Sequence, residues 1–488
     1  MRLYIKKQML DLLETLTEGV KYMGNNTNTN PESMLEDCIC AVLSIERVLQ
    51  NEGIPDTQSN IKSLLDTFYK MKSCFNTNLE FQTECKKSKA KIHSLKLFIR
   101  NKIKTQLEIA FFPYKSSMWD SMESIWKAAV QDKDCSCYVV PIPYYTKKNG
   151  VKAEYFYEGN DFPEDVPVVH YSSYDLEKRH PDIIYFHNPY DQCNYVTQVE
   201  DTYFSSNLVH FTDMLVYVPY FVYGAYKDMK SAEGFFVTSG SMNADKIIAQ
   251  SQIHKSYFVK YGLLPEKVIV AGSPKFDAVI QTTRQKFLIP PQWQDKLSGK
   301  KIILWNTTID AMLKKSNWVD KVSHLIDVAM NCSGCALIFR PHPLLEATIR
   351  SMRPQYLKSF YDLKNKILSS DNAVLDENRD AYLSIGISNA LISDYSSILL
   401  QYHATEKPIL CLDTKNWFQS EQIHIFDYSQ DYFFENEDSV ASFCNMVVNG
   451  KDPKKNNRLK ATRQSTVNID GNCGKTVHEK IKDICLSI

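Results

Sequence analysis

Apolar residues recur at three- and four-residue spacing through the first part of the chain. The segments SMLEDCICAVLSIERVL and IKSLLDTFYKMKSCF show this spacing, which predicts amphipathic helices. The polar stretch GNNTNTNPES between two such segments is a loop by composition. No strand-like alternation occurs before about residue 105, so we expect residues 1–104 to form a helical region in front of the rest of the chain.

The last predicted helix of this region is strongly basic. Eight Lys or Arg residues and no acidic residue lie between positions 86 and 104, and Ile92, Leu95, Ile99 and Ile103 fall on one helical face. A basic amphipathic helix can lie on an anionic membrane surface. The alternative, which we favour, is a surface helix that packs its apolar stripe on neighbouring protein.

Short apolar runs alternate with helical segments from residue 105 onward. The first series is LEIAFFP, CYVVPIPYY, DIIYF, MLVYVPYF, GFFVTS and KVIVAGS, and residues 241–262 have the pattern of one long helix. The series restarts after the polar stretch TTRQKFLIPPQWQDKLSGK with KIILWNT, CALIFRP, NALISD and KPILCLD. Buried strands alternating with helices are typical of parallel, doubly wound sheets. The sequence therefore predicts two α/β domains of Rossmann-like type, 105–285 and 299–488, the second ending in a helix.

The composition narrows the class of protein. Lys+Arg and Asp+Glu both number 57, so the net charge is zero and a nucleic-acid-binding protein is not expected. The 13 cysteines have no secretory leader in front of them, which indicates reduced thiols in the cytoplasm. The longest nearly apolar run, residues 214–226, contains Pro219 and is shorter than the roughly 20 residues that a membrane span needs.

Two doubly wound domains in tandem face each other across a cleft, and ligands bind at the carboxyl ends of the strands of such sheets. Nucleotide-activated donors are natural occupants of this cleft. The chain has neither GxGxxG nor GxxxxGK[ST], and no Asp-x-Asp-like pair stands in a clear donor position. We therefore expect no cofactor and no essential divalent metal.

Two strand-end loops of the first domain carry candidate groups. His187 directly follows DIIYF, so we expect it to face the cleft, where an imidazole can act as a general base. A histidine bonded to a neighbouring backbone group is the alternative. In AGSPKFD, Gly272 and Pro274 favour a tight turn with exposed N–H groups, and Lys275 can meet a phosphate. A plain strand exit is the alternative there.

Two loops of the second domain have the chemistry of a phosphate site. FRPHP holds Arg340 and His342 in a loop made rigid by prolines, and Arg offers paired donors to a phosphate. In ISDYSS a strand ends and a helix begins, so Ser396 and Ser397 combine hydroxyls with free N–H groups. Ordinary N-capping by Asp394 or Ser396 explains the same residues, and both roles can hold.

The order of these loops resembles the CDP-glycerol glycerophosphotransferase family, which comprises teichoic acid primases and polymerases of GT-B fold. The resemblance covers residues 105–485, and its specific parts are RPHP and SDYSS followed by KPI. GSPKFD is similar to the family's Gly-x-Pro-Arg-x-Asp pattern, with Lys275 at the Arg position. The late GNCGK is similar to the family's Gly-Asn-x-x-Lys.

The resemblance implies transfer of a polyol phosphate from a CDP-activated polyol to an acceptor hydroxyl, with release of CMP. In this family His187 would be the base that takes the acceptor proton, and Arg340 and His342 would bind the donor pyrophosphate. Ser396 and Ser397 would bind phosphate oxygens, and Gly272 and Lys275 would contact the same phosphates. Asp394 would orient the loop that carries the two serines. The polymerases usually have His-Gly-Thr-Pro where this chain has His187-Asn188-Pro189-Tyr190. Asp191 is the alternative base, and Asn188 lies with it on the acceptor side.

The family's acceptors imply a glycan or polyol-phosphate chain of the cell envelope or capsule, lipid-linked at the cytoplasmic membrane face, where the basic segment 86–104 would have a purpose. The second hypothesis is a GT-B glycosyltransferase that uses a nucleotide sugar and releases a nucleoside diphosphate. A third is a non-catalytic nucleotide-binding or scaffold protein. The presence of His187, Arg340 and His342 argues against the third hypothesis.

Overall fold

The computed structural model describes residues 1–26, 30–54, 57–148, 150–285, 288–315, 317–378, 380–413 and 423–487. The chain divides into two compact units. We call Met1–Ile109, with Asp132–Ser136 and Leu176–Asp182, the helical unit. The remainder, Ala110–Gln131, Cys137–Asp175 and Ile183–Ile488, is the α/β unit.

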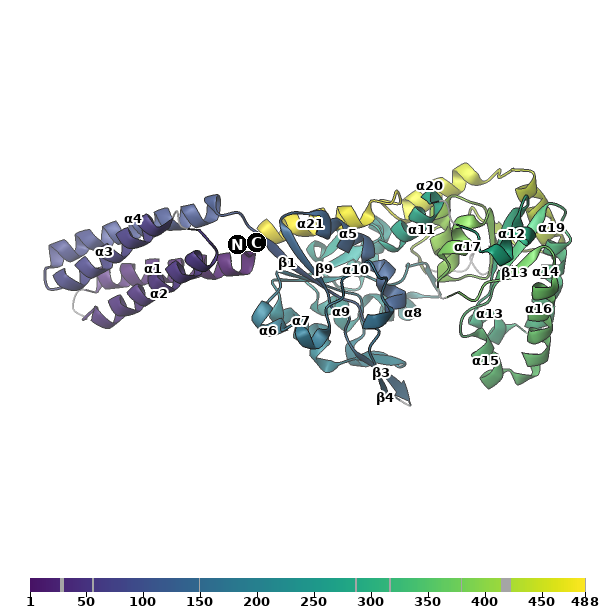
Figure 1. Ribbon diagram of the computed structural model, residues 1–488, viewed down its shortest axis with the longest axis horizontal. Coiled ribbons are helices and arrows are strands. Elements are labelled where there is room, and N and C mark those ends of the chain that lie inside the picture. Colours follow the sequence, from purple (N-terminus) through teal and green to yellow (C-terminus); the bar gives the residue numbers. More distant parts are fainter. Residues whose placement is uncertain are drawn as a thin grey trace. The chain divides into compact units, whose positions relative to one another are not determined.

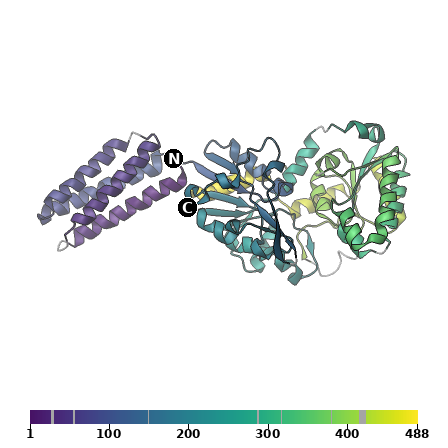
Figure 2. The same cartoon turned by 60° about the horizontal axis from the view of Figure 1, so that its bottom comes forward.

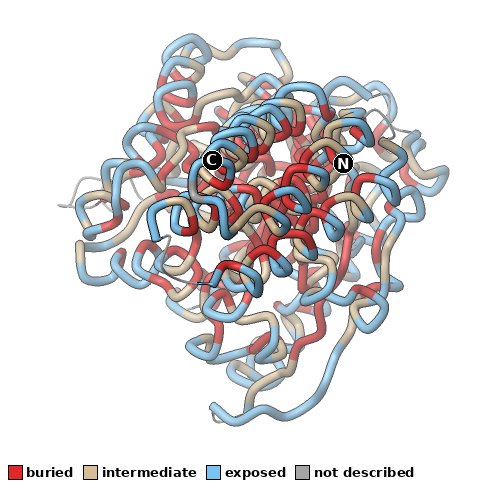
Figure 3. Tube along the Cα trace, turned by 90° about the vertical axis from the view of Figure 1, so that its left-hand side faces the viewer, coloured by how far each residue is buried: buried red, intermediate tan, exposed pale blue. Residues whose placement is uncertain are grey.

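Within its first 102 residues the helical unit has helices that lie side by side, drawn in purple to slate blue in Figures 1 and 2: α1 (Leu3–Asn25), α2 (Glu32–Asn51), α3 (Gln58–Cys74) and α4 (Asn78–Lys102). Each helix places apolar residues at three- and four-residue intervals, and these residues form one core. Figure 3 shows the result as buried stretches that alternate with exposed ones along the trace. The apolar stripes of these helices bury one another, so this region is helical, as its sequence predicts.

The basic helix α4 uses its apolar stripe inside this bundle. Ile92, Leu95 and Ile99 are completely buried in the shared core, and Ile103 is 7% exposed. Lys96 on α4 forms an ion pair with Glu14 on α1. The stripe is therefore occupied by protein, and contact with an anionic surface would rely on the charges of the basic face alone. Among the described residues, no helix has the length and apolar character that a bilayer crossing requires.

The first large sheet has the order β10-β9-β7-β5-β1-β2. Its strands are β1 (Leu107–Phe112), β2 (Cys135–Val139), β5 (Ile183–Phe186), β7 (Met214–Tyr217), β9 (Lys246–Ala249) and β10 (Val268–Val270). The pairs β5–β7, β7–β9 and β9–β10 are parallel. The strand order changes direction between β1 and β5, so a ligand site is expected at the carboxyl ends of these two strands. A small antiparallel sheet joins β3 (Tyr144–Lys148), β4 (Val151–Phe156) and β6 (Thr197–Val199).

Two local predictions in this domain are wrong. The segment GFFVTS is not a strand, because its first residues end helix α8 (Met229–Phe236) and its last begin α9 (Ser239–Asn243). Residues 241–262 are not one helix, because Lys246–Ala249 is strand β9 and only Gln252–Lys260 continues as α10. The short run 246–249 fits the helical period and the strand period equally well, and its pairing with β7 and β10 makes it a strand.

The second large sheet has the order β13-β12-β11-β14-β15-β17, and every pair in it is parallel. Its strands are β11 (Lys301–Asn306), β12 (Cys335–Arg340), β13 (Ala373–Leu375), β14 (Ala390–Ser393), β15 (Ile409–Cys411) and β17 (Tyr432–Phe433). Numbered along the chain, this is the Rossmann order 3-2-1-4-5-6, with the switch point between β11 and β14.

Helices cover both faces of this sheet. Ile303 and Trp305 face one apolar core, while Ile302 and Leu304 face the other. The helices of this half are α12 (Pro291–Leu297), α13 (Ile309–Lys314), α14 (Trp318–Met330), α15 (Leu345–Met352), α16 (Leu357–Ser369), α17 (Tyr382–Ile387), α18 (Ser397–Tyr402), α19 (Glu437–Val448) and α20 (Lys455–Ser465). The terminal helix α21 (Cys473–Ser487) packs instead against α5 (Glu123–Gln131) of the first half (Figure 1). Burial of alternate residues on both faces explains why the strands have nearly continuous apolar sequences.

Candidate active site

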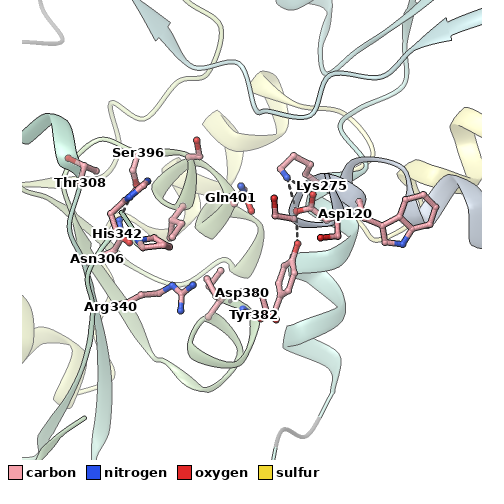
Figure 4. Close-up of a pocket in the computed structure, with 18 of the residues that line it drawn as sticks. Asp120, Lys275, Asn306, Thr308, Arg340, His342, Asp380, Tyr382, Ser396 and Gln401 are labelled. Carbon is pink, nitrogen blue, oxygen red and sulfur yellow. Dashed lines mark hydrogen bonds and ion pairs between the residues drawn. The ribbon is translucent and has the colours of Figure 1, made fainter. Parts of the chain in front are cut away.

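A pocket of about 550 Å³ lies at the carboxyl ends of the strands within the α/β unit. Its lining comes from the loops after β1, β11, β12 and β14 and from the beginnings of α11 (Lys275–Arg284) and α17. We call it the cleft pocket. In Figure 4, Asn306, His342 and Ser396 lie on the left side of it, and Asp120, Lys275 and Tyr382 lie on the right. Residues from both large sheets therefore meet here.

The end of β11 supplies amide and hydroxyl groups that the sequence analysis did not single out. The Asn306 side-chain amide donates to Ser393 Oγ at 3.0 Å and to Ser396 Oγ at 3.4 Å. The Thr307 hydroxyl is buried and has no hydrogen-bond partner among the described residues. A buried hydroxyl without a partner is costly unless a ligand supplies one. Thr307 and its neighbour Thr308 both line the pocket.

Arg340 lines the pocket from the end of β12, but it is also anchored in the protein. Its Nη1 donates to Asp376 Oδ2 at 2.8 Å, and its Nη2 donates to the Asn378 carbonyl oxygen at 3.0 Å. The ion pair is buried, since both side chains are at most 5% exposed. These bonds use two of the five guanidinium N–H groups, so the fork is held in place while it borders the pocket.

His342 also borders the pocket, and its surroundings fix its tautomer. Its Nδ1 accepts the Leu344 backbone N–H at 3.1 Å, so Nε2 carries the proton of the neutral ring. Burial and the nearby Arg340 charge lower the pKa of His342. His342 is therefore a neutral hydrogen-bond donor through Nε2 at neutral pH.

The loop after β14 is stabilised from the side away from the pocket. Asp394 is 2% exposed and pairs with Lys315 at 3.2 Å, and burial raises the pKa of Asp394 to about 6. Ser396 caps the six-residue helix α18 by accepting the Leu399 N–H. Ser396 and the exposed Ser397 line the pocket, whereas Asp394 does not. The loop-orienting role expected for Asp394 stays a prediction.

The opposite wall is built around Asp120, which the sequence analysis did not single out. Lys275 Nζ lies 2.6 Å and 2.7 Å from the two Asp120 carboxylate oxygens, and Tyr382 Oη donates to Asp120 Oδ2 at 2.6 Å. The side chains of Lys275 and Asp120 are only 8% and 14% exposed. Lys275 thus lines the pocket, but an acidic partner offsets its charge, and its expected contact with a phosphate stays a prediction.

His187 lies differently from the expectation that it faces the cleft. It is completely buried and does not line the pocket. Its Nε2 accepts the Tyr114 backbone N–H at 3.1 Å, so the proton of the neutral ring is on Nδ1, which lies 3.1 Å from Ser121 Oγ. Burial, followed by the charge of Lys275, lowers the pKa of His187 to about 3. The imidazole joins the two ends of segment 114–121, which carries Asp120.

The other predicted acceptor-side residues are also buried near this loop. Asp191 is 2% exposed, and its two carboxylate oxygens accept the backbone N–H and the hydroxyl of Ser205 at 2.9 Å and 2.6 Å. Burial raises the pKa of Asp191. Asn188 is 7% exposed and does not line the cleft pocket. Their assignments as acceptor residues stay predictions.

Gly272 lies outside the cleft pocket and has a structural reason to be glycine. Its φ is 101°, and a Cβ would lie 2.5 Å from the Val467 carbonyl oxygen. Asp277, five residues later, accepts the backbone N–H groups of Cys473 and Gly474 at 3.1 Å and 2.8 Å. The GSPKFD and GNCGK segments are therefore in contact, with Asp277 capping α21. The expected contact between Gly272 and phosphate stays a prediction that this placement does not favour.

Comparison with protein families gives one match. The sequence model of CDP-Glycerol:Poly(glycerophosphate) glycerophosphotransferases matches residues 233–482, slightly more than half of the chain. This chain belongs to that family. The match includes GSPKFD, RPHP, SDYSS and GNCGK, and the predicted family is confirmed. The protein is accordingly a transferase of the CDP-glycerol glycerophosphotransferase type. No curated protein matches the sequence of this family member.

Solved structures of similar fold include two kinds of enzyme. A putative UDP-N-acetylglucosamine 2-epimerase from Listeria monocytogenes is 14% identical with a TM-score of 0.54, covering 78% of this chain and 98% of its own. A variant of the wall teichoic acid polymerase TagF is 13% identical with a TM-score of 0.51, covering 87% of this chain and 99% of its own. At these identities the likeness concerns the fold. It confirms the GT-B class for this glycerophosphotransferase family member.

Proposed function

We propose that the protein transfers glycerol phosphate, or a related polyol phosphate, from a CDP-activated polyol to a hydroxyl of a cell-envelope or capsular acceptor and releases CMP. The observation that carries the proposal is the cleft pocket, where the RPHP and SDYSS loops of the family segment meet. Its volume of about 550 Å³ lies within the range of roughly 300–1,000 Å³ that small-molecule sites have.

The reaction is a displacement at the phosphorus that carries the polyol. The acceptor oxygen forms a bond to this phosphorus, the bond from phosphorus to the bridging oxygen breaks, and CMP leaves with that oxygen. The acceptor proton must pass to a base. Such a reaction asks mainly for positioning of the two reactants and for stabilisation of the charge that develops on the leaving phosphate.

The groups on the second-domain side suit the donor phosphates. Arg340 is held by Asp376 and keeps further N–H groups, and His342 offers its Nε2–H. The hydroxyls of Ser396, Ser397 and Thr307 complete this side, and the unpartnered Thr307 hydroxyl is explained by a bound phosphate or ribose oxygen. We assign these residues to donor binding and to stabilisation of departing CMP.

We assign the acceptor side to the wall that carries Asp120. Asp120 is a carboxylate that lines the pocket, so it can take the acceptor proton once substrate displaces Tyr382 or Lys275 from it. His187 holds the ends of the Asp120 loop and acts in this proposal as a positioning residue. The earlier prediction of His187 as the base itself requires segment 114–121 to move and free Nε2.

A lipid-linked acceptor would place the protein at the cytoplasmic membrane face, and the basic face of α4 is the surface of the helical unit that suits it. Lys86, Arg100 and Lys102 are exposed. Each basic residue near an anionic membrane contributes about 1 kcal/mol. Sedimentation with phosphatidylglycerol vesicles should fall strongly when these three residues are changed to Gln. Equal sedimentation of the variant and the parent protein would remove this part of the proposal.

The reaction is tested first by thermal unfolding with CMP, CDP-glycerol, CDP-ribitol, UDP and UDP-glucose. A ligand at 100 times its dissociation constant stabilises the folded protein by about 2.7 kcal/mol, which shifts the midpoint measurably. We expect stabilisation by the cytidine compounds only, followed by CMP release when acceptor is added. Stabilisation by the uridine compounds, with release of UDP, would instead establish the glycosyltransferase hypothesis.

A further inference from the structure

Beside the cleft pocket lies a second cavity of about 350 Å³, which we call the aromatic pocket. It shares Ser396 and Ser397 with the cleft pocket, so the two cavities meet at the same loop. Six aromatic side chains line it, and five of them come from the first half of the α/β unit: Tyr190, Tyr220, Phe221, Tyr226 and Phe235, with Tyr395 from the second half.

The aromatic pocket is a built feature of the fold. Tyr395 Oη accepts the Ala225 backbone N–H at 2.7 Å, and a Cβ at Gly224 would collide with this hydroxyl. The next residues form β8 (Ala225–Tyr226), which pairs with β16 (Ile423–His424). These contacts hold the aromatic segment against the loop that carries Ser396.

The lining has no ionic group. None of the described residues that line the aromatic pocket is Lys, Arg, His, Asp or Glu. A polyol-phosphate chain brings one negative charge per unit, and burying such charges without cations is costly. A sugar ring suits the pocket better, since its apolar face can lie on an aromatic face while its hydroxyls reach Tyr and Ser hydroxyls.

We infer that the aromatic pocket binds the terminal sugar ring of a glycan acceptor and directs one of its hydroxyls toward the donor phosphate at Ser396 and Ser397. The inference rests on the proposed function and narrows its acceptor to a glycan end rather than a polyol-phosphate end. The cytosine of the donor is the competing ring. The carboxyl ends of the strands of the second sheet border the cleft pocket, and nucleotides bind at such strand ends. We therefore place the cytidine of the donor in the cleft pocket and not in the aromatic pocket.

The test uses the full chain with radiolabelled CDP-glycerol and two classes of acceptor: octyl glycosides of glucose, N-acetylglucosamine and cellobiose, and an oligomer of glycerol phosphate. We expect transfer to at least one glycoside. Tyr220→Ala and Phe235→Ala should each raise the KM for that glycoside about ten-fold, while the KM for CDP-glycerol changes less than two-fold. Tyr220→Phe keeps the ring and should stay near the parent value.

Tyr195→Ala is the matched control, because Tyr195 is 88% exposed and lines neither pocket. Transfer to the glycerol phosphate oligomer and to no glycoside overturns the inference. A higher KM for CDP-glycerol in Tyr220→Ala, with the glycoside KM unchanged, places the donor ring in the aromatic pocket and also overturns it. If the unmodified protein does not bind CDP-glycerol, this result counts against the proposed function. CMP release without transfer to any glycoside would count against the aromatic pocket alone.

Discussion

Lys275 and Asp120 are 155 positions apart in the chain, yet the Lys275 ammonium lies within 2.7 Å of both Asp120 carboxylate oxygens. The pair joins the start of α11 to the loop after β1. Tyr382, at the start of α17 in the second half, donates to the same carboxylate. The hydrogen bond from Tyr382 therefore connects the second half of the α/β unit to a carboxylate that Lys275 holds in the first half, at the cleft pocket.

Replacing Lys275 should cost both stability and activity. Lys275→Met leaves Asp120 largely buried without its cation, and breaking a buried pair from one side costs about 3–5 kcal/mol. Asp120 is 14% exposed, so we expect the lower end of this range, measured by urea unfolding. Adding Asp120→Leu should recover part of the loss in stability but not the activity. A loss in the double variant equal to the sum of the losses in Lys275→Met and Asp120→Leu would show that the two residues are not coupled.

The roles open to His187 differ in their pH dependence. If His187 positions the Asp120 loop through Ser121 and the Tyr114 N–H, His187→Gln lowers kcat and leaves the acid limb of the pH–rate profile in place. Ser121→Ala should then have a smaller effect in the same direction, because it removes one of the two contacts. If His187 is the base, His187→Gln abolishes the acid limb and Ser121→Ala leaves the profile unchanged.

Local patterns predicted the parts of this molecule that depend on neighbours in sequence. The apolar strands and the FRPHP loop could be recognised because the deciding residues lie within a few positions of one another. KIIA at residues 246–249 was assigned to a helix because a short apolar run fits both periods, and only pairing with distant strands decides between them.

Long-range contacts explain what the sequence could not disclose about the site. Arg340 was recognised, but its partner Asp376 lies on another loop. Asp120 stands in the segment SSMWDS, which forms a 3-10 helix, and nothing nearby marks its pairing with Lys275 and Tyr382. His187 was expected to face the cleft, but segment 114–121 covers it and its sequence gives no sign of this contact.

Acid should destabilise the protein through its buried histidines. Burial lowers the pKa of His187 and that of His254 to about 3, from 6.5 in the unfolded chain. The folded state therefore holds these rings neutral, and their contribution to stability is complete above pH 6.5 and is lost as the pH falls toward 3. Each such group changes the free energy of unfolding by about 1.4 kcal/mol per pH unit in this window. Urea midpoints of His254→Gln should fall less steeply with decreasing pH than those of the parent protein, and parallel curves would contradict this.

His342 offers a test of donor chemistry with little disturbance of the fold. In His342→Asn the side-chain oxygen can accept the Leu344 N–H as Nδ1 does, so the loop should keep its shape while the Nε2–H toward the pocket is lost. Loss of one preorganised donor to a charged transition state lowers kcat about 10²- to 10³-fold. We expect this loss in CMP release, with a thermal midpoint close to that of the parent protein. Leu344→Pro is a control for the loop itself, since it removes the N–H and retains the imidazole. Full activity in His342→Asn would show that His342 does not stabilise the leaving group, and this role would then belong to Arg340 and the Ser396 loop.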